Sequence, residues 1–187
     1  RARTMFPIDT SLFLWLNATP DSPAWMLKLA MFASQQLPGL IVAGTFGALV
    51  VAPRDVRRGV WRVLLAMAMA WVLARLGQHL LALPRPFALE LGKQWIEHGN
   101  SAGFPSTHAS VAFAFGAAVA VSCRRAIVAL LALSAAGLIA WSRICLGLHF
   151  PSDVVAGLLV GLFCALVSRA LLRPIWVAQG AHHASAR

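Results

Sequence analysis

The chain has 187 residues, of which 59% are hydrophobic and only 12% are charged, and its mean hydropathy is +0.74. Soluble domains carry about 25% charged residues on average, so this composition excludes an ordinary soluble enzyme, a disordered chain and a disulfide-rich secreted domain. The formal net charge is +10, and 14 of the 16 basic residues are arginine. Most of them stand at the ends of apolar runs rather than along one face, which favours membrane orientation signals over nucleic-acid binding.

The apolar runs are continuous and do not alternate, so they predict helices. We expect residues 1–4, which precede Met5, to be an added segment, and residues 11–16 to form a short interfacial turn of helix. The break at Pro38-Gly39 and the Pro84-Arg85-Pro86 segment separate further helices. Six are expected, at about 23–36, 39–52, 59–83, 105–122, 126–146 and 151–172. The prediction is an all-α, polytopic membrane bundle of about six transmembrane helices, with one domain over residues 5–175 and a polar cytoplasmic tail over 176–187.

The loop arginines predict the orientation. If the helices alternate, one side carries both termini and most of the arginines, and the other side carries only Arg85, Lys93 and Arg143. The positive-inside rule places the richer side in the cytoplasm. Loops 84–104 and 142–152 then face outward. The arginines of the cytoplasmic side are Arg54, Arg57, Arg58, Arg62, Arg124, Arg125, Arg169 and Arg173.

Three polar groups lie where outward helix ends meet these loops, and a compact bundle brings such ends together. Pro105 favours a helix start, which places Ser106, Thr107 and His108 in the first turn, where free N–H groups favour an anion. Ser-Thr at a helix start is more often a simple helix cap. The second group is Arg85-Pro86, and the third begins at Ser142-Arg143. Guanidinium groups bind phosphate oxygens in bidentate fashion, although either arginine alone is explained by contact with lipid headgroups.

His149 and Asp153 complete the third group, four residues apart across Pro151. Pro151 favours a helix start, with Asp153 in the first turn and His149 just before it. A carboxylate that holds one imidazole nitrogen leaves the other nitrogen as a nucleophile. His108 is then a candidate acid that protonates a leaving oxygen.

In order and internal spacing, the three groups resemble the three signatures of the type-2 phosphatidic acid phosphatase superfamily, which also includes soluble vanadium haloperoxidases: Arg85-Pro86, Pro105-Ser106-Thr107-His108 and Ser142-Arg143-x5-His149-x3-Asp153. The resemblance implies that His149 attacks phosphorus to form a phosphohistidine, that Asp153 orients it and that His108 is the general acid. It implies no metal and no cofactor. The implied phosphate-binding residues are Arg85, Arg143, Ser106, the backbone of Thr107 and, beside Arg143, Ser142.

Two positions depart from the family pattern. Thr107 stands where the second signature usually has glycine, which a role of the backbone N–H group tolerates. Gln78 stands where the first signature usually has lysine, so one phosphate partner is absent. Arg75 and His79 lie on the same helix stripe, and we hypothesise that one of them substitutes for the lysine. The alternative is that Arg75 only extends its charged head towards water.

Further segments resemble the bacitracin-resistance-type undecaprenyl pyrophosphate phosphatases, which also tend to lack that lysine: residues 17–22, Arg85-Pro86-Phe87 and Trp141-Ser142-Arg143. The resemblance implies a polyprenyl diphosphate substrate and an active site on the outer face of the bacterial cytoplasmic membrane. Alternatives are a phosphotransferase acting on lipid A, a phosphatidylglycerophosphate or phosphatidate phosphatase, and a non-catalytic lipid-headgroup binder or transporter. The oligomeric state stays open.

Three loop residues are weaker candidates for the site. Glu90 and Glu97 form a conceivable carboxylate pair, but an exposed loop face explains them better. His98 is a candidate for contact with a second phosphate.

Overall fold

The computed structural model describes residues 7–99 and 101–172, and all regular structure within these ranges is helical. The all-α fold class is therefore confirmed. Residues 1–4 and 176–187, for which we expected an added segment and a polar tail, lie outside the described residues. The elements are α1 (Pro7–Leu16), α2 (Ala24–Gln35), α3 (Leu37–Val51), α4 (Arg54–Leu81), the 3-10 helix η1 (Pro86–Leu89), α5 (Thr107–Ser122), α6 (Ala126–Cys145) and α7 (Pro151–Leu171).

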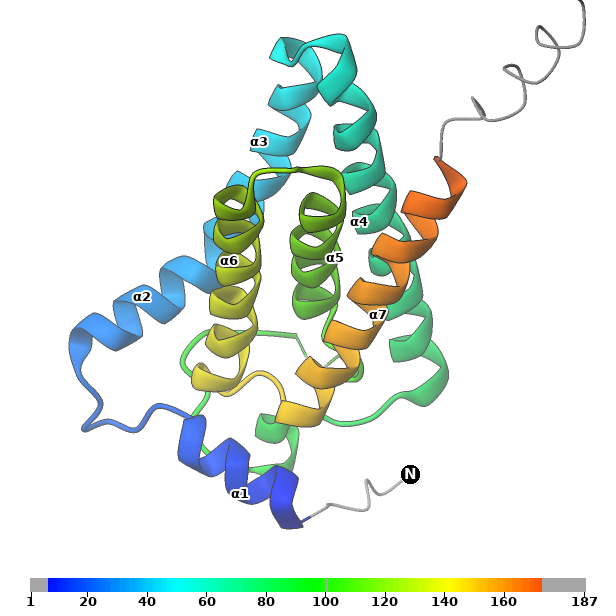
Figure 1. Ribbon diagram of the computed structural model, residues 1–187. Coiled ribbons are helices and arrows are strands. Elements are labelled where there is room, and N and C mark those ends of the chain that lie inside the picture. Colours follow the sequence, from blue (N-terminus) through cyan, green and yellow to red (C-terminus); the bar gives the residue numbers. More distant parts are fainter. Residues whose placement is uncertain (1–6, 100, 173–187) are drawn as a thin grey trace, which may run out of the picture.

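Helix α5 is the centre of the bundle and packs on α4, α6 and α7 (Figure 1). Small residues allow this close approach: a Cβ atom added at Gly161 of α7 would lie 2.6 Å from the backbone nitrogen of Ala114. One at Gly157 would lie 2.9 Å from Cβ of Ala109. The glycine pair in α7 therefore forms a helix–helix contact, which small residues favour in membranes.

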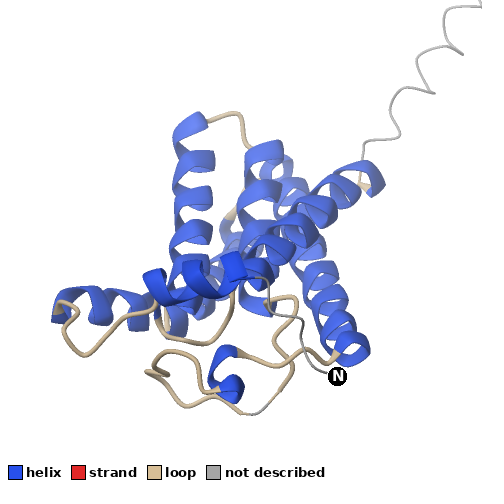
Figure 2. Ribbon diagram, turned by 90° about the horizontal axis from the view of Figure 1, so that it is seen from below, coloured by secondary structure: helices blue, strands red, loops and turns tan. Residues whose placement is uncertain are grey.

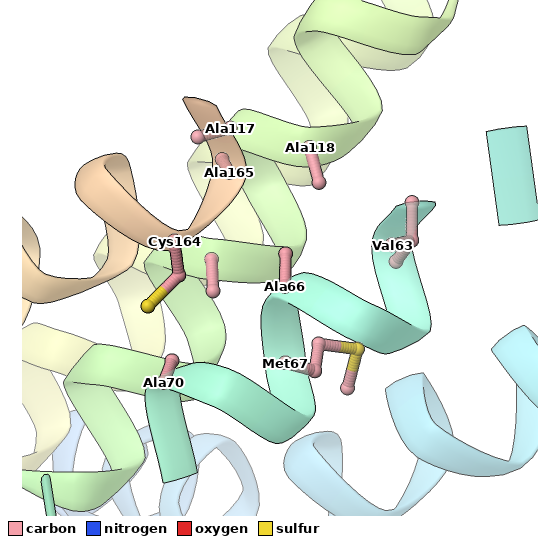
Figure 3. Packing of buried hydrophobic residues seen from close by; sticks show 9 residues of the cluster. Val63, Ala66, Met67, Ala70, Ala117, Ala118, Cys164 and Ala165 are labelled. Atoms are coloured by element: carbon pink, nitrogen blue, oxygen red, sulfur yellow. The ribbon is translucent and has the colours of Figure 1, made fainter. Parts of the chain in front are cut away.

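The apolar core of the bundle lies where α4, α5 and α7 meet (Figure 3). It consists mainly of alanine, so the three helix backbones lie close together, and Met67 of α4 is its longest side chain. The buried residues of this cluster are Val63, Ala66, Met67, Ala70, Ala114, Ala117, Ala118, Cys164 and Ala165.

Three described stretches are long and apolar enough to cross a membrane: Val56–Leu89, Ala126–Cys145 and Pro151–Leu171. Helices α2 and α3 reach the required length only together, and they meet at an angle of 42°. Pro38 lies at the start of α3 and accounts for this break, since proline cannot continue the hydrogen-bond ladder of a preceding helix. Two of the six expected helices are thus long enough to cross a membrane only as one bent pair.

This bend changes the expected position of the N-terminal region. Helix α1 lies at the lower end of the bundle in Figure 1, where the carboxylate of Asp9 accepts hydrogen bonds from Ser152 at the start of α7. Helix α7 ends at the opposite end, where Arg62 donates to the carbonyl of Leu172. The described chain therefore begins and finishes at opposite ends of the bundle. The expectation that both termini lie on one side counted α2 and α3 as two crossings, and the terminal residues themselves lie outside the described ranges.

The lower end is closed by the long connection between α4 and α5, which carries η1 (Figure 2). Asn17 holds this connection in place because its side chain bonds both N–H and C=O of Lys93 and also the carbonyl of Cys145. The indole of Trp95 donates to the carbonyl of Ala18. These hydrogen bonds, all at least partly buried, fix the loop against the ends of α1 and α6.

Candidate active site

The three polar groups meet at the lower end of the bundle, at the end of α4, the start of α5 and the connection from α6 to α7. Four of their side chains are almost fully buried: Arg85 is 3% exposed, Arg143 2%, His149 1% and Asp153 0%. Burying charged groups is costly unless they are paired or bind a charged ligand. Such a cluster is therefore a candidate active site.

His149 and Asp153 are positioned by the turn that starts α7. Pro151 begins the helix, and Oδ2 of Asp153 accepts the N–H group of Phe150 at 2.9 Å. The same oxygen lies 3.4 Å from Nδ1 of His149. The carboxylate thus caps the helix and orients the imidazole, as the four-residue spacing in the sequence predicts.

Arg85 contacts the other ring nitrogen of the same imidazole. Its Nη1 lies 2.9 Å from Nε2 of His149 and 3.1 Å from the carbonyl of Leu148. A guanidinium has donors only, so Nε2 must be the acceptor and the imidazole proton lies on Nδ1, facing Asp153. Burial lowers the pKa of His149 to about 4, against the opposing effect of the hydrogen bond to Asp153. The imidazole is therefore neutral at pH 7, with its lone pair on Nε2.

Loop residues 101–103 hold the side chain of Arg85 in place. The carbonyl of Ser101 accepts from Nε at 2.8 Å, and the carbonyl of Ala102 accepts from Nη2 at 3.2 Å. A Cβ atom at Gly103 would lie 3.1 Å from Cγ of Arg85 and 3.3 Å from Oδ2 of Asp153, so this position needs a small residue. These contacts have no signature in the sequence, because all but one of the loop acceptors are backbone carbonyls.

Arg143, in the last turn of α6, has free donors. Its Nη1 donates to Oγ of Ser34, a buried residue of α2. Its Nε and Nη2 are buried and have no hydrogen-bond partner among the described residues. Leaving buried charged donors unsatisfied costs about 1–3 kcal/mol or more, and a phosphate group matches their geometry. Ser34 was missed by the sequence reasoning, and its signal was a small polar residue within an apolar helix.

The start of α5 also presents unsatisfied groups. The N–H group of Ser106 donates to the carbonyl of Asp153 at 3.0 Å, which ties α5 to α7. Its hydroxyl is fully buried, does not cap the helix and has no partner among the described residues. The simple cap that the sequence left open is therefore not formed. The first turn of α5 keeps its N–H groups and this hydroxyl for a ligand.

Gln78 occupies the position of the missing lysine and links α4 to α5. Its amide nitrogen donates to the carbonyl of Pro105 at 3.0 Å and to Oγ1 of Thr107 at 2.9 Å. Arg75 donates to Oε1 of Gln78 at 3.2 Å, whereas the side chain of His79 is exposed. Of the two candidate substitutes for the lysine, Arg75 is the one connected to the site through Gln78.

The other candidate residues are less well placed to contact a phosphate group in the site. The hydroxyl of Ser142 donates to the carbonyl of Ile139 in its own helix at 2.7 Å, so it is directed along α6. Glu90 and Glu97 are exposed, in keeping with a loop face. His98 is half-buried, and burial lowers its pKa, with a further contribution from the charge of Arg85. That contribution places His98 in the electrostatic field of the site.

A small apolar cavity of about 210 Å³ adjoins the site. Thr107 and His108 form one wall, and the cavity continues between α3, α4, α5 and α6 towards Trp71. An apolar space that begins at a polar site suits a ligand with a charged head and a hydrocarbon chain. The remaining lining residues are Pro38, Ile41, Val42, Met67, Val111, Ala112 and Ile139. Within residues 7–99 and 101–172, no group of three His, Cys, Asp or Glu residues is placed to hold a metal ion.

Comparison with known proteins agrees with this geometry. Residues 59–176 match the model of the PAP2 superfamily. YbjG of Escherichia coli K12, which is named provisionally as an undecaprenyl-diphosphatase, is 35% identical over 178 residues, covering 92% of this chain and 85% of YbjG.

Two solved structures share the fold. The crystal structure of Aquifex aeolicus LpxE has a TM-score of 0.74 at 23% identity, covering 88% of this chain and 96% of LpxE. That of the first transmembrane PAP2-type phosphatidylglycerolphosphate phosphatase from Bacillus subtilis has a TM-score of 0.64 at 19% identity, covering 92% of this chain and 86% of that one. The chain described above is therefore an integral membrane protein that belongs to the PAP2 superfamily.

Proposed function

We propose that the protein is a lipid-pyrophosphate phosphatase that converts undecaprenyl diphosphate to undecaprenyl phosphate and inorganic phosphate through a phosphohistidine. The observation that carries this proposal is the buried, neutral imidazole of His149, held between Asp153 at Nδ1 and Arg85 at Nε2. A packing histidine needs no charged partner on each nitrogen. A nucleophile needs a fixed tautomer and a lone pair aimed at its target.

In the first step, the terminal phosphate binds to Arg143, to Arg85 and to the start of α5. Arg143 offers Nε and Nη2, and the phosphate gives Nη1 of Arg85 a charged acceptor that replaces Nε2 of His149. The freed lone pair of Nε2 attacks phosphorus, and the bond from phosphorus to the bridging oxygen breaks. The negative charge of the bound diphosphate favours the protonated form of His108. His108 then donates its proton to that oxygen, so lipid monophosphate leaves and a phosphohistidine stays.

In the second step, a water molecule attacks the phosphohistidine. His108, now neutral, accepts a proton from the water, the P–N bond breaks, and the electron pair returns to Nε2 of His149. Inorganic phosphate leaves. Asp153 stabilises the positive imidazole in both steps through Nδ1–H, which is the role of the carboxylate in other oriented histidines.

The substrate is inferred from two observations. YbjG, at 35% identity, is named for activity on undecaprenyl diphosphate. The cavity beside His108 is apolar and receives the first part of a hydrocarbon chain. The fold alone is shared with a phosphatidylglycerolphosphate phosphatase, which makes that lipid the second candidate substrate. Transfer of the phosphoryl group to lipid A is a third candidate reaction. A non-catalytic headgroup binder or transporter is disfavoured, because it does not require the pairing of His149 with Asp153.

The orientation of the site follows from charge. The helix ends opposite to the site carry most of the arginines, so the positive-inside rule places them in the cytoplasm and the site on the outer face. With α2 and α3 as one bent passage, α1 lies on the outer side. The outer face of the bacterial cytoplasmic membrane is therefore the proposed location.

Phosphate release by the purified protein tests the substrate. We expect C55 diphosphate to give a kcat/KM at least tenfold above that of phosphatidate or phosphatidylglycerophosphate. A higher value for either glycerolipid would overturn the substrate assignment and leave the phosphatase. Release that rises only when lipid A is added would instead assign a phosphotransferase.

A further inference from the structure

A second, larger cavity lies at the end of the bundle opposite to His149. It measures about 840 Å³ and lies between the hairpin of α3 and α4 and the hairpin of α5 and α6. Helix α3 packs on α2 and α4 and only slightly on α6, so this space separates the two hairpins. The walls are apolar and include Leu40, Ile41, Val60, Val63, Phe115 and Val119.

Arginines surround this cavity. Arg58, Arg62, Arg124 and Arg125 line it, and its described lining includes no acidic residue. Helix α6 begins at Ala126 without a side-chain cap, so its first N–H groups face the same region. The cavity therefore combines a strongly positive rim with an apolar interior.

Two buried polar atoms in the lining lack partners. Nε of Arg62 and Oγ of Ser122 are both buried and make no hydrogen bond within the described part of the chain. Nη2 of Arg62 donates to the carbonyl of Leu172, which fixes the guanidinium at the rim. Buried groups of this kind are normally satisfied, so they indicate a polar ligand group at this depth.

We propose that this cavity binds an anionic phospholipid of the bilayer, with its phosphate among the arginines and one acyl chain between the two hairpins. The charge of the rim selects the phosphate, and the apolar walls select the chain. Basic pockets between transmembrane helices on the cytoplasmic side bind anionic headgroups in this manner. The site is separate from the catalytic residues and needs none of them.

A cavity-filling pair of variants tests the acyl-chain part. Gly44 lines the cavity, and a Cβ atom there would meet no atom within 4 Å. Gly44→Leu therefore fills the cavity without a clash at Cβ. Gly47 lies one turn away on the same helix, is equally unobstructed and is not part of the lining, so Gly47→Leu is the matched control.

Native mass spectrometry of detergent-purified protein supplies the readout. We expect dioleoyl phosphatidylglycerol to bind at least fivefold more tightly than dioleoyl phosphatidylcholine to the wild type and to Gly47→Leu. Gly44→Leu should weaken that binding at least tenfold. Equal binding of the two lipids, or an unchanged affinity in Gly44→Leu, would overturn the proposal.

A charge pair tests the headgroup part independently. Arg124→Gln combined with Arg125→Gln should weaken phosphatidylglycerol binding at least tenfold, whereas Arg169→Gln, outside the lining, should not change it. An unchanged affinity in the double variant would contradict the assignment. Displacement of the bound lipid by millimolar inorganic phosphate would reassign the site to a free anion. Ile41 lines both cavities, so the hydrocarbon chain of the substrate is the alternative occupant of the larger one. Displacement of the bound lipid by undecaprenyl phosphate, but not by a second anionic phospholipid, would assign the larger cavity to that chain.

Discussion

The two ends of the bundle use the same residue type, arginine, in opposite ways. At the catalytic end, Arg85 and Arg143 are 3% and 2% exposed. Their donors bond His149, loop carbonyls and Ser34, except for two donors of Arg143 that have no partner within the described ranges. At the other end, Arg57, Arg124 and Arg125 are exposed. An exposed arginine at a helix end interacts with water and headgroups, whereas a buried one requires an anion. Burial, more than position at a helix end, distinguishes the arginines of the candidate active site from those that act as orientation signals.

The strongest test of the catalytic end is its proposed nucleophile. His149→Gln should reduce turnover at least 10³-fold, because no other side chain of the described residues presents a fixed lone pair at that position. Phosphate release from C55 diphosphate measures the loss. His79→Gln, an exposed histidine of α4, is the matched control and should keep more than half of the activity. A loss of less than tenfold in His149→Gln would break the assignment.

The difference between buried and exposed arginines predicts a smaller but selective effect. Arg143→Lys should lower kcat/KM about 10²-fold, because an ammonium group cannot replace the bidentate fork. The same change at exposed Arg169 should lower it by less than twofold. Steady-state kinetics over a range of substrate concentrations measure both. Equal effects of the two substitutions would mean that burial does not distinguish the two groups of arginines.

Ser34 tests how Arg143 is held. Ser34→Ala removes the acceptor of Nη1, and we expect kcat/KM to fall about tenfold, in line with the loss of a hydrogen bond to a charged group. Ser168→Ala is the control, since Ser168 is also buried in a helix and its hydroxyl donates to the carbonyl of Ala165. Its effect on kcat/KM should be less than twofold. A matching loss in both variants would point to general destabilisation.

The missing lysine yields a finer prediction. Arg75→Ala should lower kcat/KM by about threefold to tenfold, because Arg75 braces Gln78, which in turn holds Thr107 at the start of α5. His79→Ala should have no measurable effect. The reverse order would assign the compensating role to His79. If neither variant changed turnover, the compensation hypothesis would be abandoned.

The smallest effect concerns stability and pH. The folded pKa of His149, about 4, lies below the usual value of 6.5, so the unfolded chain binds this proton first as the pH falls. The stability from the neutral imidazole is complete above pH 6.5 and is lost between pH 6.5 and pH 4, by about 3 kcal/mol at most. The Tm in detergent should therefore fall less steeply over this range in His149→Gln than in the wild type. Parallel Tm curves would contradict the lowered pKa.

The signatures and the helices were predictable because they depend on local sequence. Pro151 starts α7 as predicted, whereas α5 starts at Thr107, two residues after Pro105, with Ser106 as its N-cap. The spacing of His149 and Asp153 placed the carboxylate on the imidazole. The start of α4 at Arg54 was not predicted, although Pro53 before it favours a helix start and arginine is a good helix former.

Long-range contacts could not be read from the sequence. Ser34 meets Arg143 across 109 residues, and although the break at Pro38 was predicted, the angle of 42° between α2 and α3 does not follow from the local sequence. The loop carbonyls around Arg85 are invisible in any residue pattern, since every residue type carries a backbone carbonyl. The side on which the N-terminal region lies could not be read from the sequence either, because it depends on whether α2 and α3, bent by 42°, cross the membrane once or twice.

Trapping the covalent intermediate tests the central claim most directly. Rapid quenching of the wild type with ³²P-labelled C55 diphosphate should yield an acid-labile, base-stable phosphoprotein within the first turnover, as expected of a phosphohistidine, and none in His149→Gln. Turnover by the wild type without any such species, or an equal amount of it in His149→Gln, would contradict the account.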